Sequence, residues 1–286
     1  MSDISSRASR HRQRVPRACI AIAVTVFSGV AARAQVSPAP TAAATPETPA
    51  STYRFVPAID VPVLVLGSLG WAAPYAFSSR IITPTCPCDR ASVNAFDRGA
   101  IGHHSDLAGY VSDGTVGLAL LAPAIIMVRG AAAPAAWEDL SVYAEVLVVN
   151  GALATVVKFA VQRPLPRTYE GQADLVSSPR GYRSFYSGHT SLAFAALSAG
   201  SMTMSLRYGH VWVPWLVTLA VGASVGAERV LGGYHFPSDV LVGALVGTAT
   251  GVIIPYLHAR RDRSSSVRFG IFPSGRSVWL AATGSF

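Results

Sequence analysis

The sequence predicts an all-α fold, a transmembrane bundle of about six helices followed by a short β-hairpin-like tail. Of its 286 residues, 51% are hydrophobic and only 13% are charged, a balance typical of integral membrane proteins. Helices that cross a bilayer need about twenty apolar residues. A soluble protein with buried core helices is the alternative. Six apolar runs approach the required length: 61–79, 114–128, 140–157, 190–206, 208–227 and 240–259.

The first 53 residues are expected to lie outside this bundle. Residues 7–17 carry five arginines and no acid, a short apolar segment follows, and Ala32-Arg33-Ala34 offers a cleavage site. This order predicts a secretory signal peptide at residues 1–34, with an uncleaved anchor helix as the alternative. Residues 35–53 are rich in Pro, Ala and Thr and are expected to form a disordered linker.

Residues 54–260 are predicted to form the membrane-embedded domain. Four of the six runs are comfortably long enough to cross a bilayer, whereas the second and third are marginal. Pro62 and Pro74 interrupt the first run, so this run is expected not to cross fully if the signal peptide is cleaved. If the signal segment is retained instead, all six runs can cross.

Small residues spaced by four in the last two runs allow helix backbones to approach closely in lipid. We expect this packing within one chain, so a monomer is favoured over a dimer. These residues are Gly222, Gly226, Gly243, Gly247 and Gly251.

The net charge of +8 does not indicate a nucleic-acid partner, because five arginines lie at residues 7–17 of the predicted signal peptide and no basic aromatic patch is present. Arg260, Arg261 and Arg263 directly follow the last run, which places this end in the cytoplasm. The polar stretches at the other end of the last run would then face the periplasm of a bacterial-type inner membrane.

The stretch from Arg229 to Asp239 places a cation, a histidine and a carboxylate just before the last apolar run. Pro237 and Ser238 predict a helix start, because proline suits the first turn and serine caps free N–H groups. His235 and Asp239 are four residues apart, so one helical turn would put both on the same face. Such a carboxylate makes an imidazole a better nucleophile. A structural His–Asp pair in a polar loop is the alternative.

A second polar stretch opens the fourth run. Ser187 and Gly188 are expected at a helix start, where free backbone N–H groups and the helix dipole bind anions. His189 would lie beside that anion and could protonate a leaving oxygen. An ordinary helix cap followed by a histidine is the alternative. Cations end the third run or occupy the loop before this stretch: Lys158, Arg163, Arg167, Arg180 and Arg183.

Together these stretches resemble the signature of the type-2 phosphatidate phosphatase and vanadium haloperoxidase superfamily. That signature is Lys-x6-Arg-Pro, Pro-Ser-Gly-His and Ser-Arg-x5-His-x3-Asp, and the resemblance covers about residues 110–258. It implies a helical core, often of six membrane helices, and metal-free phosphoryl transfer through a phosphohistidine.

The resemblance also implies roles for individual residues. His235 would be the nucleophile and Asp239 its orienting partner. His189 would protonate the leaving group and then act as base for water. Phosphoryl transfer depends mostly on positioning and charge stabilisation, so a phosphate cradle is required. Its implied members are Lys158, Ser187, Gly188 and Arg229.

Three positions depart from the signature. Leu165 stands where the signature has arginine, and Arg163 or Arg167 is expected to supply the missing guanidinium. Tyr186 replaces the signature proline. Glu228 replaces the signature serine and would put an acid beside a site for anions.

The only cysteines outside the signal region, Cys86 and Cys88, could form a local disulfide or a metal site, although the spacing matches no zinc pattern well. A structural role is favoured. In the tail, residues 261–286, two short β-prone segments at 267–272 and 277–281 flank a Pro-Ser-Gly-Arg turn and predict a hairpin.

The sequence therefore predicts a phosphatase that removes phosphate from a lipid phosphomonoester or diphosphate, with no metal and no other cofactor. The resemblance implies phosphatidate, phosphatidylglycerol phosphate, a polyprenyl diphosphate or a lipid A phosphate as substrate. One alternative is a vanadate-dependent haloperoxidase of the same superfamily. Another is a catalytically weak or inactive lipid-binding membrane protein with the same fold.

Overall fold

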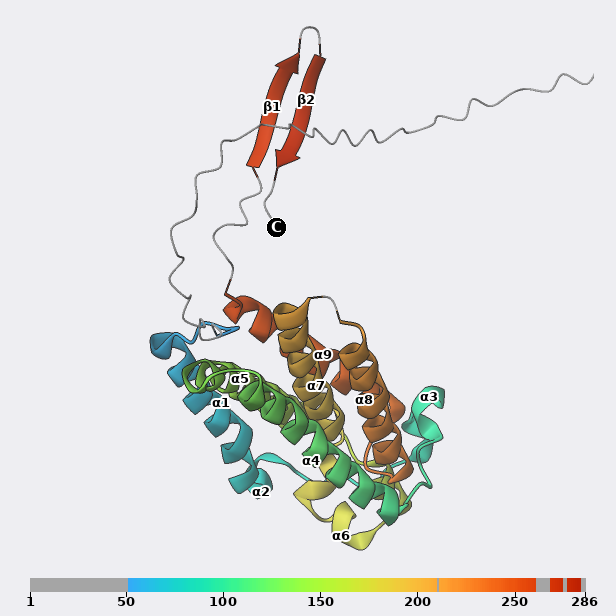
Figure 1. The fold of residues 1–286 in the computed structure, drawn as a ribbon. Coiled ribbons are helices and arrows are strands. Elements are labelled where there is room, and N and C mark those ends of the chain that lie inside the picture. The colour runs from blue at the N-terminus through green and yellow to red at the C-terminus, as the bar shows by residue number, and fades with distance from the viewer. Residues whose placement is uncertain (1–50, 210, 261–267, 275–276, 284–286) are drawn as a thin grey trace, which may run out of the picture. The chain divides into compact units, whose positions relative to one another are not determined.

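The computed structural model describes residues 51–209, 211–260, 268–274 and 277–283. Six long helices dominate this part of the chain, and each corresponds to one predicted apolar run (Figure 1). The prediction of a helical bundle of about six helices is therefore confirmed. The helices are α1 (Pro57–Ala76), α4 (Asp106–Arg129), α5 (Ala133–Val161), α7 (Gly188–Tyr208), α8 (Val213–Leu231) and α9 (Pro237–His258).

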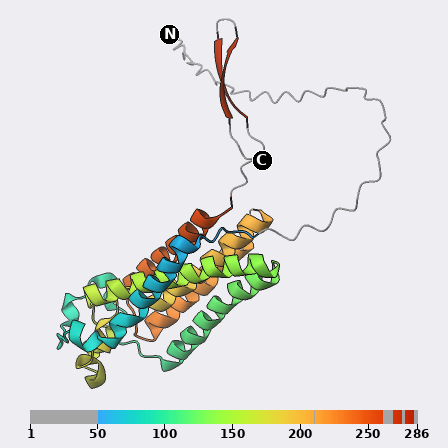
Figure 2. The ribbon, with the colours of Figure 1, turned by 90° about the vertical axis from the view of Figure 1, so that its left-hand side faces the viewer.

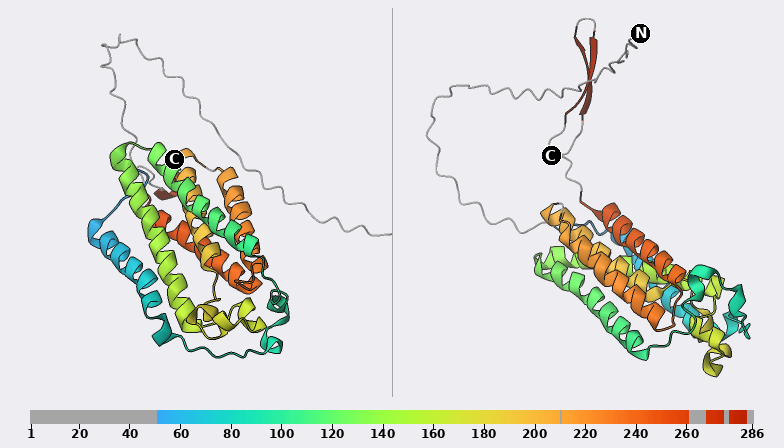
Figure 3. Two further views of the ribbon diagram at one scale, coloured as in Figure 1. Left: turned by 90° about the horizontal axis from the view of Figure 1, so that it is seen from below. Right: turned by 90° about the vertical axis from the view of Figure 1, so that its right-hand side faces the viewer.

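Short helical turns fill the two longest connections, between α1 and α4 and between α5 and α7. Figures 2 and 3 show that these turns gather at one end of the bundle. The starts of α4, α7 and α9 and the ends of α5 and α8 meet there. The turns are α2 (Ser78–Ile81), η1 (Arg90–Ser92), α3 (Ala95–Arg98), η2 (Pro166–Glu170), α6 (Ala173–Val176) and η3 (Pro179–Tyr182).

The central helix is α7, which packs against α4, α5, α8 and α9. Twelve of its 21 residues are buried, and most of these are Ala, Ser, Thr or Gly. Small side chains let four neighbours approach one helix. In contrast, α1 packs chiefly on α5 at the edge of the bundle (Figure 3).

Glycines on α9 set its close contact with α7. A Cβ atom on Gly243 would lie 2.7 Å from the carbonyl oxygen of Ser187, and one on Gly247 would lie 2.1 Å from that of Ser191. Real Cβ atoms do not approach this closely, so only glycine fits. The predicted packing of this stripe within one chain is confirmed.

Four helices among the described residues are long and apolar enough to cross a membrane: α1, α4, α5 and α9. This set differs from the one that run length alone favoured. The second and third runs, judged marginal, are among the four. The fourth and fifth runs, in α7 and α8, are not, because in α7 many Ser, Thr and Gly residues face other helices.

The expectation that the first run does not cross fully if the signal peptide is cleaved stays a prediction. α1 continues through both Pro62 and Pro74 for 20 residues, and it is one of the four helices that can cross a membrane. The prolines therefore do not interrupt the helix.

The boundary of the linker needs a correction as well. Tyr53 is only 1% exposed, and it forms an antiparallel bridge with Ala259 just after α9. Thr52 donates a backbone hydrogen bond to Asp139 near the start of α5. Residues 51–53 thus belong to the bundle, and both ends of this domain lie at the end opposite the short turns. The predicted signal peptide and the rest of the linker lie outside the described residues.

The predicted hairpin in the tail is confirmed. Strands β1 (Arg268–Ser274) and β2 (Ser277–Thr283) pair antiparallel, with Ser274 opposite Ser277. Both strands extend beyond the predicted segments.

Candidate active site

A cavity of about 520 Å³ opens at the end of the bundle where the short turns gather. His189 and His235, which come from different helix starts, both line it. Asp174 is the one carboxylate among its described lining residues. A cavity wall with more positive than negative side chains favours an anion. Five cationic side chains also line it: Lys158, Arg167, Arg180, Arg183 and Arg229.

His235 ends a tight turn between α8 and α9. Gly233 occupies this turn with a φ of 67°, and a Cβ atom there would lie 1.9 Å from the carbonyl oxygen of His103. The His235 side chain is 5% exposed, and burial lowers its pKa to about 3. The imidazole is therefore neutral near pH 7, the state that a nucleophile requires.

Asp239 lies beside His235 as predicted, in the first turn of α9. Its Oδ2 is 3.7 Å from Nδ1 of His235, slightly beyond hydrogen-bond distance. The same oxygen accepts hydrogen bonds from Oγ of Ser184 at 2.5 Å and from the backbone N–H of Phe236 at 2.9 Å. The second bond caps α9 and confirms the predicted helix start. The carboxylate is thus held where it can accept a hydrogen bond from the protonated Nδ1 of His235.

Arg163 lies behind Asp239 and does not line the cavity. Its Nη1 donates to Oδ1 of Asp239 at 2.6 Å, and its Nη2 donates to Oδ2 of Asp97 at 2.8 Å. Its guanidinium also stacks 4.0 Å from the ring centre of Phe236. Arg163 therefore positions the carboxylate of Asp239 and is not free to replace the guanidinium missing at Leu165.

Asp97, in α3, was not singled out from the sequence. It is fully buried, and it accepts hydrogen bonds from the backbone N–H of Ser238 at 2.9 Å and from the Ser238 hydroxyl at 2.6 Å. Burial opposes its ionisation, but these bonds and the one from Arg163 outweigh it and lower the pKa of this carboxyl. Asp97 thus ties the short turns to the start of α9. The sequence around Asp97 gave no indication of this role, because it is a loop of ordinary composition.

Of the two predicted replacements for Leu165, only Arg167 lines the cavity, as does Leu165 itself. Nε of Arg167 donates to the carbonyl oxygen of Gly232 at 2.7 Å, and its Nη2 donates to Asp106 at 2.9 Å. These bonds hold the guanidinium across the turn that carries His235.

The predicted helix start at Ser187 is confirmed, since α7 begins at Gly188. The Ser187 hydroxyl is fully buried, accepts a bond from the N–H of Thr190 and does not line the cavity. Gly188 and His189 do line it, and among the described residues their backbone N–H groups have no hydrogen-bond partner. The N–H of Ser187 donates to the carbonyl oxygen of Asp239 at 3.0 Å, so the starts of α7 and α9 lie together. Both helix dipoles thus point their positive ends at the site.

His189 has a carboxylate partner that sequence reasoning missed. Its Nε2 lies 2.8 Å from Oδ1 of Asp113 on α4, and the same oxygen lies 3.4 Å from Nη1 of Arg229. Asp113 immediately precedes an apolar run, and that position at the edge of a run could have identified it. Asp113 thus contacts two side chains that line the cavity, although neither Asp113 nor Glu228 lines it.

Three cations that line the cavity have no carboxylate partner among the described residues. Lys158 donates from Nζ to the carbonyl oxygen of Arg183 at 2.7 Å. The Arg183 guanidinium lies 5.0 Å from the ring centre of Tyr75. Arg180 has no ion pair either. Arg180 and Arg183 were noted in the sequence but not assigned to the site.

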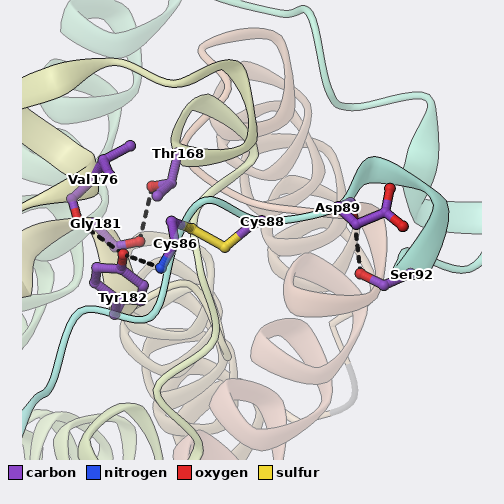
Figure 4. Close-up of a disulfide and its surroundings, with 8 residues drawn as sticks. All are labelled: Cys86, Cys88, Asp89, Ser92, Thr168, Val176, Gly181 and Tyr182. Carbon is purple, nitrogen blue, oxygen red and sulfur yellow. Dashed lines mark hydrogen bonds between the residues drawn. A yellow bond between two sulfur atoms is a disulfide. The ribbon is translucent and has the colours of Figure 1, made fainter.

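Cys86 and Cys88 form a disulfide at this end of the bundle (Figure 4). The backbone N–H of Cys86 donates to the Tyr182 hydroxyl at 2.9 Å, which in turn donates to the carbonyl oxygen of Val176. The disulfide segment therefore supports the loop that carries Arg180 and Arg183. With both sulfur atoms bonded to each other, the alternative of a metal site at these cysteines does not hold.

Parts of the chain are similar to known proteins. Residues 139–263 match the family model described as the PAP2 superfamily. A probable diacylglycerol pyrophosphate phosphatase 1 from Schizosaccharomyces pombe is 29% identical over 147 residues, which cover 41% of this chain and 52% of that protein. Lipid phosphate phosphatase 1 from Arabidopsis thaliana is 32% identical over 129 residues, or 36% and 39% of the two chains.

The chain thus spans about half the length of the first of these relatives and less of the second. The crystal structure of Aquifex aeolicus LpxE is similar with a TM-score of 0.40 and 25% identity, over 55% of this chain and 90% of that one. The matched region contains every residue of the predicted site, from Lys158 to Asp239. Residues 139–263 of this chain are therefore similar to the PAP2 superfamily.

Proposed function

We propose that this protein is a membrane phosphatase that hydrolyses a lipid phosphomonoester or diphosphate through a phosphohistidine. One observation carries the proposal: two histidines from separate helix starts line one cavity with five cationic side chains. This combination supplies a nucleophile, a proton donor and charge stabilisation for a phosphoryl group.

In the first step, the imidazole of His235 attacks phosphorus while Asp239 stabilises the positive charge that develops at Nδ1. The bond from phosphorus to the ester oxygen breaks, and protonated His189 gives its proton to that oxygen. In the second step, His189 takes a proton from water, and the hydroxide formed attacks the phosphohistidine. Inorganic phosphate leaves, and both imidazoles return to their starting states.

Burial and the Arg229 guanidinium lower the pKa of His189 to about 4, and the Asp113 carboxylate 2.8 Å away opposes this shift by stabilising the imidazolium that the first step needs. Lys158, Arg183 and Arg229 stabilise the charge on the equatorial oxygens of the phosphoryl group. The free N–H groups of Gly188 and His189 are further donors to this group.

A lipid is proposed as the rest of the substrate because the site lies at the end of helices that can cross a membrane. The cavity also has an apolar wall that includes Trp71 and Tyr75 of α1, the outermost helix, and Leu192 of α7. The printed names of the relatives, a diacylglycerol pyrophosphate phosphatase and a lipid phosphate phosphatase, support the same substrate class.

Phosphate release by the purified protein in detergent tests this proposal. The substrates are phosphatidate, phosphatidylglycerol phosphate, a polyprenyl diphosphate and a lipid A phosphate, with glycerol phosphate as the water-soluble comparison. We expect release from at least one lipid phosphate and none from His235→Ala or His189→Ala. The control is His104→Ala, since His104 lies outside the cavity. Turnover that persists without His235 would show that the protein does not act through this residue.

We also propose that the site faces the periplasm of a bacterial-type inner membrane. A disulfide at the site end needs an oxidising compartment, and the arginines after α9 favour the cytoplasm for the other end. Because Tyr53 bridges Ala259, this orientation keeps residue 53 in the cytoplasm and is incompatible with cleavage after Ala34. N-terminal sequencing decides: a mature chain that begins at Gln35 would contradict the proposed orientation.

A further inference from the structure

A second cavity, of about 1360 Å³, opens at the end of the bundle opposite the candidate active site. Asp60 of α1, Glu145 of α5 and His258 of α9 line it. These residues come from three helices and are far apart in the sequence. None of them has a part in the proposed phosphatase mechanism.

The three side chains have the spacing of metal ligands. Nε2 of His258 lies 3.3 Å from Oδ1 of Asp60 and 3.4 Å from Oε2 of Glu145. The three ligand atoms all lie within 4.8 Å of one another. In a tetrahedral zinc site with bonds of about 2.1 Å, neighbouring ligand atoms are about 3.4 Å apart.

Each side chain is held in the orientation of a ligand. Nδ1 of His258 lies 2.8 Å from the carbonyl oxygen of Ile254. A proton on Nδ1 satisfies that carbonyl and leaves the lone pair of Nε2 directed at the carboxylates, which is the usual arrangement of a metal-bound histidine. The backbone N–H of Val56 donates to Oδ2 of Asp60 at 2.6 Å, so that Oδ1 faces the cluster.

Glu145 supplies the most direct sign of a missing ligand. The residue is only 6% exposed, and its Oε2, directed at the other two side chains, has no hydrogen-bond partner among the described residues. The only ion-pair partner of Glu145 and of Asp60 in this part of the chain is His258. A buried carboxylate oxygen without a hydrogen bond is costly, and a bound cation removes that cost.

Of the three arginines that line this cavity, Arg54 is exposed and forms no ion pair in the described structure, and the other two have carboxylate partners outside the cluster. In the same cavity, Nη2 of Arg207 pairs with Asp139, and Nη2 of Arg260 pairs with Glu138 at 2.7 Å. With a neutral His258, the cluster therefore keeps two negative charges, which match one divalent cation.

We propose that Asp60, Glu145 and His258 bind one divalent transition-metal cation, with Zn²⁺ as the representative ion. One imidazole and two carboxylates suit Zn²⁺ better than Ca²⁺ or Mg²⁺, which prefer oxygen ligands alone. Water from the cavity fills the remaining position. The cation fastens α1, α5 and α9 together at the end where the domain begins and ends.

Zinc binding by the full chain tests this proposal. The protein is purified with a tag that contains no histidine, stripped with a chelator and titrated with Zn²⁺ alone in equilibrium dialysis. We expect one tightly bound Zn²⁺ per chain and a higher melting temperature with Zn²⁺ than without it. Co²⁺ is expected to produce the visible absorption bands of a four-coordinate site.

The test variants are Glu145→Gln and His258→Gln, which keep the side-chain size. We expect each to lower zinc affinity at least tenfold and to remove the Co²⁺ bands, with helix content by circular dichroism as the check on folding. The matched control is His104→Gln, which removes a histidine paired with Glu170 outside the cluster. Wild-type protein that binds no Zn²⁺, or folded test variants that bind it as tightly, would overturn the proposal and favour a proton shared between His258 and the carboxylates.

Discussion

The two ends of the bundle differ in which charged side chains have ion-pair partners. At the candidate active site, Lys158, Arg180 and Arg183 line a cavity without a carboxylate partner among the described residues. At the other end, Arg207 and Arg260 are each paired with a carboxylate, and the buried carboxylates of Asp60 and Glu145 have only His258 as an ion-pair partner among the described residues. Several unpaired cations in one cavity favour an anion there, whereas the paired Arg207 and Arg260 hold the helices together. Mutations at the two ends should therefore affect different properties.

The largest effect is expected from Arg207→Gln. Arg207 pairs with Asp139, which is fully buried, so the mutation leaves an uncompensated buried carboxylate. Loss of one partner of such a pair costs about 3–5 kcal/mol. We expect a much lower melting temperature by scanning calorimetry, with an unchanged KM in the protein that remains folded. A change in KM without a loss of stability would contradict the assignment of this end to structure.

The next largest effect is expected from Arg183→Gln at the active-site end. The lost guanidinium stabilises the phosphoryl group, so kcat/KM for a lipid phosphate should fall roughly 10- to 100-fold. The melting temperature should change little, because Arg183 has no carboxylate partner in the described structure. Arg129→Gln, at the far end of α4, is the control. Equal losses of activity in both variants would remove the distinction between the two ends.

A smaller effect is expected from Asp113→Asn. The substitution keeps the size of the side chain but removes the charge that stabilises protonated His189. We expect kcat to fall about tenfold at neutral pH and to recover partly at lower pH, where His189 is protonated without help. A pH–rate profile measures this shift, and a profile that matches the wild type would show that Asp113 does not act through His189.

The stability of the active-site end should depend on pH through His235. Burial lowers the pKa of His235 from 6.5 to about 3, so between these values the unfolded chain binds a proton that the folded protein does not. Stability therefore falls as pH falls through this range. From about pH 7 to about pH 4.5, the melting temperature should fall by several degrees more in the wild type than in His235→Asn. An equal fall in both proteins would mean that His235 is accessible to protons in the folded state.

The smallest effect is expected from Leu165→Arg, which restores the residue of the family signature. Leu165 lines the cavity, so an arginine there could reach a phosphoryl group without displacing Arg163. We expect phosphate release equal to the wild type or up to severalfold greater. A large loss of release, measured on the same lipid phosphate, would show that the five existing cations already fill the site.

Comparison of Arg163 with Arg167 shows where sequence reasoning reached its limit. Both flank Leu165 in the same loop, and spacing alone could not separate them. In the structure, Arg163 turns behind the site to Asp239 and Asp97, and Arg167 turns toward the cavity. The difference depends on Asp97, which approaches from a distant loop and has no sequence signal of its own.

The sequence by itself determined the helical bundle, the stripe of glycines and the histidines of the site. These features follow from local patterns: apolar runs of membrane length, small residues spaced by four and polar residues at helix starts. Only the tertiary structure decided which charges meet, including the pairing of Asp113 with His189 and the cluster of Asp60, Glu145 and His258. The physical reason is that electrostatic partners are chosen by distance in space, and helices that lie side by side bring together residues that no local pattern connects.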